Sequence, residues 1–148
     1  MIRLELPWLP PSANHAYMNN GFGGRTLSKE GRAFLVKTKA HLAQKHPKEL
    51  MLFKSNTPFL LVFRFFFEGV TTKGFATGKA ESRYKKIDVD NRIKLLADAL
   101  KDAGGIDDSQ YFSFVVQKLE GTPERTVIWA WDLEKESTPF DDPLRRLT

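Results

Sequence analysis

The chain has 148 residues, of which 41% are hydrophobic and none is cysteine, and it carries 23 Lys and Arg against 18 Asp and Glu. This length indicates one domain that can bury a core without disulfides or a structural metal. The lack of cysteine excludes a disulfide scaffold, a cysteine zinc site and a thiol nucleophile, and it fits a reducing cytoplasm. Every apolar run is shorter than the roughly 18 residues of a membrane span, so no membrane segment is expected.

The net charge of +5 is unevenly distributed along the chain. Residues 1–86 hold 15 Lys and Arg against 5 Asp and Glu, whereas residues 87–148 hold 8 against 13. The basic first part indicates a polyanionic partner, although a solvated surface explains the same excess.

The first part of the chain predicts a strand, a glycine-rich segment and a helix. Apolar and polar residues alternate over residues 2–6, which predicts a strand that the following prolines end. Residues 12–27 are rich in Asn and Gly and predict a mobile hairpin or loop. Ser28 is the expected N-cap of a helix over residues 29–44, and His46-Pro47 ends that helix.

The middle of the chain combines a buried strand with a long loop. Residues 59–67 are apolar at almost every position, which is typical of a strand covered on both faces. Residues 69–86 have no periodicity and are rich in glycine and charge, so they predict a long exposed loop. Apolar residues then recur at helical spacing over residues 90–103, and Gly104-Gly105 supplies the stop.

The last part predicts two strands and a tail. Side chains alternate over residues 112–117 and 127–133, with a turn at residues 120–125. We therefore expect an α+β fold over residues 1–134, with a mixed β-sheet packed against two main helices. Residues 135–148 are polar and predict a C-terminal tail.

Acidic residues and one lysine gather around the helix predicted at residues 90–103. Asp88 and Asp90 are two positions apart, so an extended backbone places both carboxylates on one side. Lys94 and Asp98 follow one and two turns after Asp90 on the same helix face. Asp107-Asp108 follows the glycines that end the helix.

Such a cluster favours a hard metal ion. Carboxylates within about 4–6 Å of one another remain ionised together only when a cation joins them. Oxygen ligands are typical of Mg²⁺ or Mn²⁺, which can activate water and stabilise charge on a phosphoryl group.

Each element also has a purely structural interpretation. Asp88 or Asp90 is a possible helix cap, and Lys94 a possible partner of Asp90 and Asp98 on a solvated face. Asp107-Asp108 is also typical of an ordinary turn.

The combination of these motifs resembles one family, the RusA-type Holliday-junction resolvases. The resemblance covers most of residues 2–120, and two departures are a longer loop at 69–86 and the extra tail. The segments that carry it are Leu6-Pro7, Pro10-Pro11-Ser12-Ala13-Asn14, Asp88-Val89-Asp90-Asn91, Lys94, Ala97-Asp98-Ala99-Leu100, Ala103-Gly104 and Ile106-Asp107-Asp108-Ser109-Gln110.

This resemblance implies a small homodimeric, Mg²⁺-dependent endonuclease with a RusA-like fold that nicks branched DNA symmetrically during recombination and repair, with Mn²⁺ as a possible substitute. By position, Asp88, Asp90 and Asp108 match the metal-binding catalytic aspartates and Lys94 the essential lysine. Asp107 is an additional metal candidate. Asn14 belongs to the family-like opening, and Asp98 matches an acidic helix position without an assigned role.

Basic and aromatic residues in the flexible segments are candidates for DNA contact. Phe22 and Phe75 lie in glycine-containing segments, where each is either a wedge against unstacked bases or part of the core. The expected phosphate contacts are Arg25, Lys73, Lys79, Arg83, Lys85 and Lys86.

Two other functions remain open at this point. One is a basic nucleic-acid-binding module whose aspartates are only helix caps. The other is an Asp-x-Asp metal-dependent transferase, for which the chain is short and lacks a glycine-rich phosphate loop before a helix.

Overall fold

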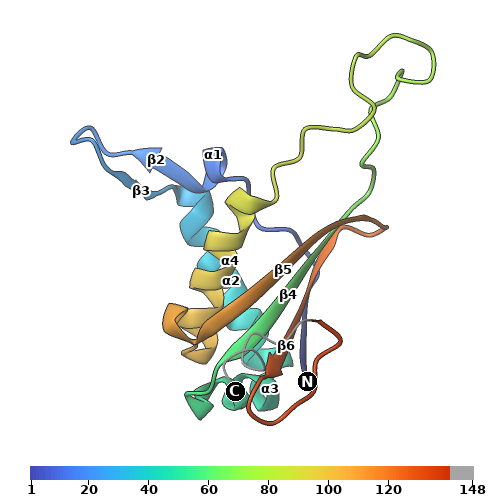
Figure 1. Cartoon of the computed structure of the whole chain (residues 1–148). Helices are drawn as coiled ribbons and strands as arrows, with labels where there is room; N and C mark the ends of the chain where they lie inside the picture. The colour runs from blue at the N-terminus through green and yellow to red at the C-terminus, as the bar shows by residue number, and fades with distance from the viewer. Residues whose placement is uncertain (141–148) are drawn as a thin grey trace.

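The computed structural model describes residues 1–140, which form a mixed sheet with helices on one face (Figure 1). The strand order is β1-β6-β4-β5. The strands are β1 (Ile2–Leu6), β4 (Phe59–Phe67), β5 (Tyr111–Glu120) and β6 (Arg125–Asp132).

The centre of the fold is a crossover from β4 through α4 (Asp90–Gly104) to β5. β4 pairs in parallel with β5 and antiparallel with β6, and parallel neighbours require such a crossover connection. The sheet is therefore mixed, and the predicted α+β fold with two main helices is confirmed. The last two strands follow one another in the sequence but do not pair, because β4 lies between them.

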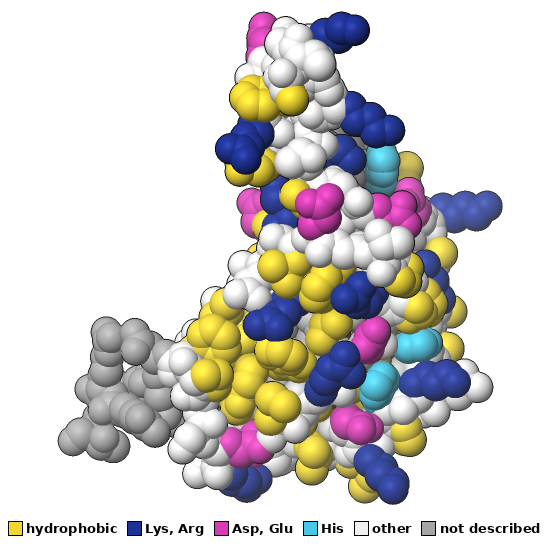
Figure 2. All heavy atoms as spheres, turned by 90° about the vertical axis from the view of Figure 1, so that its right-hand side faces the viewer, with side chains coloured by type: hydrophobic (Ala, Val, Ile, Leu, Met, Phe, Trp, Pro, Cys, Tyr) yellow, Lys and Arg dark blue, Asp and Glu magenta, His cyan; other side chains and the backbone are white. Residues whose placement is uncertain are grey.

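The sheet separates two apolar clusters. Leu61, Phe63 and Phe65 of β4 point toward the helices and are buried, as expected for a strand covered on both faces. Leu60 and Val62 point to the other face, where they pack in a smaller cluster. This second cluster also contains Val115, Trp129, Trp131, Leu133 and Phe140. Figure 2 shows hydrophobic side chains gathered on the face that the helices do not cover.

The second main helix, α2 (Lys29–Lys45), begins and ends where the sequence predicts to within one residue. The Ser28 hydroxyl accepts a hydrogen bond from the backbone N–H of Gly31 at 3.0 Å, which confirms Ser28 as the N-cap. Pro47 ends this helix but also starts a further one, α3 (Pro47–Leu52), which was not predicted. Proline is well tolerated in the first helical turn because that N–H has no helical acceptor. A short 3-10 turn, η1 (Phe53–Ser55), follows.

Two segments project from the body at the end where α4 begins (Figure 1). The first is a hairpin of β2 (Tyr17–Asn19) and β3 (Arg25–Leu27), preceded by a short helix, α1 (Ala13–Ala16), that the sequence analysis missed. The second is the predicted loop at residues 69–86, which contains no helix and one isolated bridge between Thr71 and Tyr84.

The described part of the predicted tail, residues 135–140, lies against the body. The ring of Phe140 packs edge-on against Trp131 with 5.9 Å between centroids, and Glu136 pairs with the amino group of Met1. The rest of the tail lies outside the described residues. Within residues 1–140, none of the helices has both the length and the apolar character needed to cross a membrane.

Candidate active site

The start of α4 presents two carboxylates to solvent. Ile87 and Val89 pack against the main core, whereas Asp88 and Asp90 are exposed. This alternation is the physical basis for the predicted placement of both acids on the outer side. The N-cap position itself is occupied by Val89, and no side-chain cap bond is made there. The N-cap position predicted for Asp88 or Asp90 is thus held by Val89, with Asp88 directly before it and Asp90 as the first helical residue.

Further along α4, three of the predicted residues share a hollow of about 370 Å³. Lys94, Asp98 and Asp108 line it together with Tyr111. Burial raises the pKa of Asp98, the charge of Lys94 opposes this rise, and the carboxylate of Asp108 adds to it. The Tyr17 hydroxyl of the hairpin also donates to Oδ2 of Asp98 at 3.5 Å. The structure thus brings Lys94 and Asp108 together around Asp98.

The turn after α4 places Asp108 in this hollow. Gly105 ends the helix with a φ of 75°, and a 3-10 turn, η2 (Asp108–Gln110), follows. Asp107 caps η2: its side chain accepts from the backbone N–H of Ser109 at 3.1 Å, and its own N–H donates to the side chain of Gln110 at 2.8 Å. This capping box fixes the backbone from which Asp108 projects.

The two neighbouring aspartates therefore have different surroundings. Nζ of Lys101 lies 2.9 Å from Oδ2 of Asp107, while Oδ1 of Asp107 bonds Ser109. The bond from Lys101, followed by those from Ser109, lowers the pKa of Asp107 to about 2. Asp108 is exposed and faces Asp98. Asp107 is engaged in structural contacts, whereas Asp108 lines the hollow.

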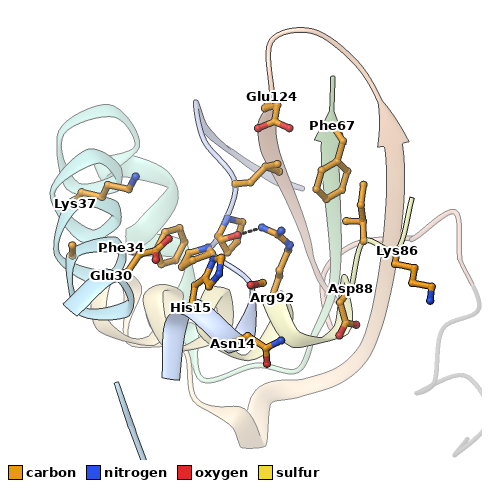
Figure 3. A pocket seen from close by; sticks show the side chains of 16 residues that line it. Asn14, His15, Glu30, Phe34, Lys37, Phe67, Lys86, Asp88, Arg92 and Glu124 are labelled. Carbon is orange, nitrogen blue, oxygen red and sulfur yellow. Dashed lines mark hydrogen bonds between the residues drawn. The ribbon is translucent and has the colours of Figure 1, made fainter. Parts of the chain in front are cut away.

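A larger hollow, of about 940 Å³, lies at the start of α4 and shares no lining residue with the first (Figure 3). Asn14, Lys86 and Asp88 line it, so three predicted residues come together here. Arg92 reaches into this hollow from the first turn of α4 and donates to the carbonyl of Pro10. That bond ties the proline-rich opening segment to the helix that carries the acids.

The donor chemistry of the site fits a hard cation, because the candidate ligands are all carboxylates. Within residues 1–140, however, no group of three or more acidic, His or Cys side chains is gathered closely enough to hold a metal. The spacing along α4 explains this. Asp108 lies beside Asp98, and Asp98 is eight residues after Asp90, which is about 12 Å along a helix that rises 1.5 Å per residue. Lys94 stands midway between the two acids.

The six predicted phosphate contacts are all exposed. Arg25 lies on the hairpin, and the other five lie in the loop at residues 69–86. Figure 2 shows Lys and Arg side chains along the projection above the sheet. Both projections that frame the start of α4 therefore carry positive charge.

Sequence reasoning missed two polar residues of the site. The Tyr111 hydroxyl is buried and has no hydrogen-bond partner among the described residues. Burial and the charges of Asp108 and Asp98 raise its pKa, so the phenol is protonated and can donate at neutral pH. Arg92 is the other missed residue. Arg92 lies within the predicted helix over residues 90–103, and Tyr111 directly precedes the strand predicted over residues 112–117. No spacing signal separates either from ordinary helix or strand residues.

Exposed carboxylates along one helix therefore lie between two projections that carry Lys and Arg side chains. The family model described as Endodeoxyribonuclease RusA matches residues 7–129, and the chain belongs to this family. The matched segment includes every predicted metal-binding, catalytic and DNA-binding residue. This is a family of metal-dependent nucleases that act on Holliday junctions, and the expected membership is confirmed. A comparison with curated proteins found no match.

Proposed function

We propose that this protein is a Mg²⁺-dependent endonuclease that resolves four-way DNA junctions by paired, symmetric nicks in recombination and repair. The observation that carries the proposal is the exposure of Asp88 and Asp90 at the start of α4, at the end of the molecule from which the basic loop projects. Family membership supports the nuclease class, and the site geometry supports the assignment of roles.

The proposed ligands are Asp88, Asp90 and Asp108. A bound Mg²⁺ or Mn²⁺ would activate water and stabilise charge on the phosphoryl group. A cation offsets the repulsion between carboxylates, which favours a closer approach of Asp108 to the start of α4. Asp107 remains a fourth candidate, but it must give up Lys101 before it can bind a metal.

Two further polar groups are proposed to act on the substrate, and a third to position them. Lys94 is exposed, and its ammonium can offset negative charge that develops on the phosphate oxygens. The protonated phenol of Tyr111 offers a donor in the same hollow. Asp98 holds the hairpin through Tyr17 and orients Lys94 by its charge, which makes it a positioning residue.

Paired nicks require two sites, and we propose that two copies of the chain supply them. The surface we assign to the dimer is the sheet face opposite the helices, where Val115 and Trp129 are half-buried (Figure 2). A two-fold contact on this face matches the near two-fold symmetry of a four-way junction. A sedimenting species of monomer mass at assay concentrations would contradict this arrangement.

The decisive experiment is Asp88→Asn with Asp102→Asn as the matched control. Both positions are exposed aspartates near or on α4, but Asp102 lies outside the proposed ligand set. We expect Asp88→Asn to lose junction cleavage by a thousandfold or more, equivalent to about 4 kcal/mol of transition-state stabilisation. Junction binding in EDTA should persist, and Asp102→Asn should cleave normally.

This experiment also separates the other two functions. A basic binding module would bind the junction and show no Mg²⁺-dependent cleavage even in the unaltered protein. A transferase would leave the junction uncut and consume a nucleotide donor. Cleavage that survives Asp88→Asn would contradict the proposed metal site.

A further inference from the structure

The tip of the β2–β3 hairpin carries an aromatic side chain that the fold does not use. Phe22 is 97% exposed, more than any other large hydrophobic side chain in the described residues. By comparison, Phe75 in the other projection is 42% exposed. An aromatic ring left almost wholly in water contributes little to folding, so its place at the tip calls for a partner outside the chain.

The tip of the hairpin is a hydrogen-bonded turn that exposes the ring of Phe22. The side-chain oxygen of Asn20 accepts from the backbone N–H groups of Phe22 at 3.1 Å and Gly24 at 3.0 Å. The N–H of Asn20 in turn donates to the carbonyl of Gly24 at 3.0 Å. Gly21 and Gly23, on either side of Phe22, have φ values of 77° and 80° that favour glycine. Phe22 is therefore held at the apex by its neighbours' hydrogen bonds.

The base of the hairpin is fixed to the helices that form the site. The backbone N–H of Ser28 donates to the carbonyl of Ala16 at 2.8 Å, and Arg32 of α2 donates to the carbonyl of Leu27 at 2.7 Å. Tyr17, the first residue of β2, contacts Asp98 of α4. A strand rises about 3.3 Å per residue, so Phe22 lies on the order of 15 Å from Tyr17. That reach equals about four or five nucleotide steps of 3.4 Å.

The chemistry of the tip fits a nucleic acid. Residues 17–27 contain one basic residue, Arg25, and no acidic residue. The hairpin projects from the same end of the molecule as the basic loop and the start of α4. Aromatic side chains stack on any base whose face is open, irrespective of its sequence.

We propose that Phe22 is a wedge that stacks on the bases exposed at the branch point of the junction. This inference rests on the proposed function, because it takes the branched substrate as given. Bases inside a linear duplex are already stacked, and opening a step for a wedge has an energetic cost. At a branch point the continuous stack is interrupted, so the ring finds an open base face. Phe22 thus selects branched DNA over linear duplex.

The test measures binding in EDTA, so that no strand is cut. The probes are an immobile four-way junction and a linear duplex of equal length, and the variants are Phe22→Ala and Phe22→Trp. Met51→Ala is the control, since Met51 is an exposed apolar side chain on α3. We expect Phe22→Ala to bind the junction at least tenfold more weakly and the linear duplex within twofold of the unaltered protein.

Further readouts separate stacking from other roles. Phe22→Trp should retain junction affinity because the indole also stacks. A 2-aminopurine placed at the branch point should change its fluorescence with the unaltered protein and with Phe22→Trp, but not with Phe22→Ala. The dependence of junction affinity on salt should be unchanged in Phe22→Ala, because no phosphate contact is removed.

Two results would overturn the wedge. One is an unchanged ratio of junction to duplex affinity in Phe22→Ala. The other is a change in sedimentation of Phe22→Ala, which would identify the tip as a contact between copies of the chain. Failure of the wedge and failure of the proposed function can be told apart. If the proposed function is wrong, the unaltered protein shows no Mg²⁺-dependent cleavage. The wedge test measures binding alone.

Discussion

Different forces stabilise the body of the molecule and its polar end, which comprises the β2–β3 hairpin, the loop at residues 69–86 and the start of α4. In the body, β4 is buried on both faces between the helices and the second apolar cluster. At the polar end, the loop at residues 69–86 is closed by backbone bonds such as Thr72 to Arg83 and Lys85 to Val70, each 2.9 Å. The groups proposed to bind metal and DNA lie at this second end, on the exposed side of α4, or in η2 and its N-cap after α4.

This difference separates stability from function. Removing apolar groups from the body should unfold the protein, because burial is the dominant favourable term in folding. Removing charges or exposed rings from the polar end should leave the fold intact and change what the protein binds. The predictions below test this separation, beginning with the largest effect.

The largest effect is expected for Phe63→Ala in the centre of β4. Phe63 is fully buried, and its ring lies 5.4 Å from that of Phe114 between centroids. Its removal should lower the free energy of unfolding by about 3–5 kcal/mol, measured by denaturant titration. Phe22→Ala is the matched control, because the same side chain is deleted where it is exposed. Equal losses in both variants would contradict the separation.

A smaller loss is expected for Gly31→Ala, at the joint between the body and the hairpin. A Cβ at Gly31 would lie 2.4 Å from the carbonyl oxygen of Ala16, so α1 and the hairpin must move away from α2. Overpacking costs about 1–3 kcal/mol, and the better helix propensity of alanine returns up to about 1 kcal/mol. We expect a net loss of about 1 kcal/mol in unfolding free energy. Lys39→Ala, at an exposed position of α2, should show no such loss.

Neutralising two charges of the loop should affect DNA binding alone. The change is Lys85→Ala with Lys86→Ala, and the control is Lys45→Ala with Lys48→Ala, an equal charge change on exposed residues of the body. If both loop lysines contact phosphates, the slope of log affinity against log salt should become shallower by about 0.9 per contact. The control should keep the original slope, and the unfolding curves of both double variants should match the unaltered protein. If the slope became shallower by the same amount in both double variants, the loop lysines would contribute only through their overall charge and not through specific phosphate contacts.

The smallest effect concerns pH and Asp107. Its pKa is lowered to about 2 in the folded protein from its ordinary value of 3.8, so the folded state favours the ionised form. The resulting contribution to stability is present above about pH 3.8 and is lost as the pH falls toward 2. A carboxyl-carbon NMR titration should place the midpoint near 2. Lys101→Ala should move that midpoint upward, because Lys101 is the largest cause of the shift. An unmoved midpoint would show that Lys101 is not the partner.

Much of the secondary structure was predictable because it depends on local patterns. The cap at Ser28, the uninterrupted apolar run of β4 and the glycines after α4 each have a nearby physical cause. The helices α1 and α3 were missed. α1 has four residues, and α3 begins at Pro47, which reads as a helix end. Neither is long enough to show a periodic pattern.

The candidate site was predictable in its residues but not in its arrangement. The sequence placed Asp88, Asp90 and Lys94 on one short segment, and the structure leaves all three exposed there. The resemblance matched Asp108 to a catalytic aspartate and left Asp107 as an additional candidate, but the physical difference between them arises from Lys101 and the capping box. Tyr111 and Arg92 were missed because their roles depend on which elements they face.

The sequence by itself determined the family, the acids around one helix and the basic, glycine-rich segments, since motif spacing, charge and backbone freedom are properties of the chain. Only the tertiary structure decided that β4 separates the last two strands, that Asp108 folds back beside Asp98, and that Phe22 stands alone at a fixed tip. These contacts join residues far apart in the sequence, and their geometry follows from packing the crossover and anchoring the hairpin on α2 and α4.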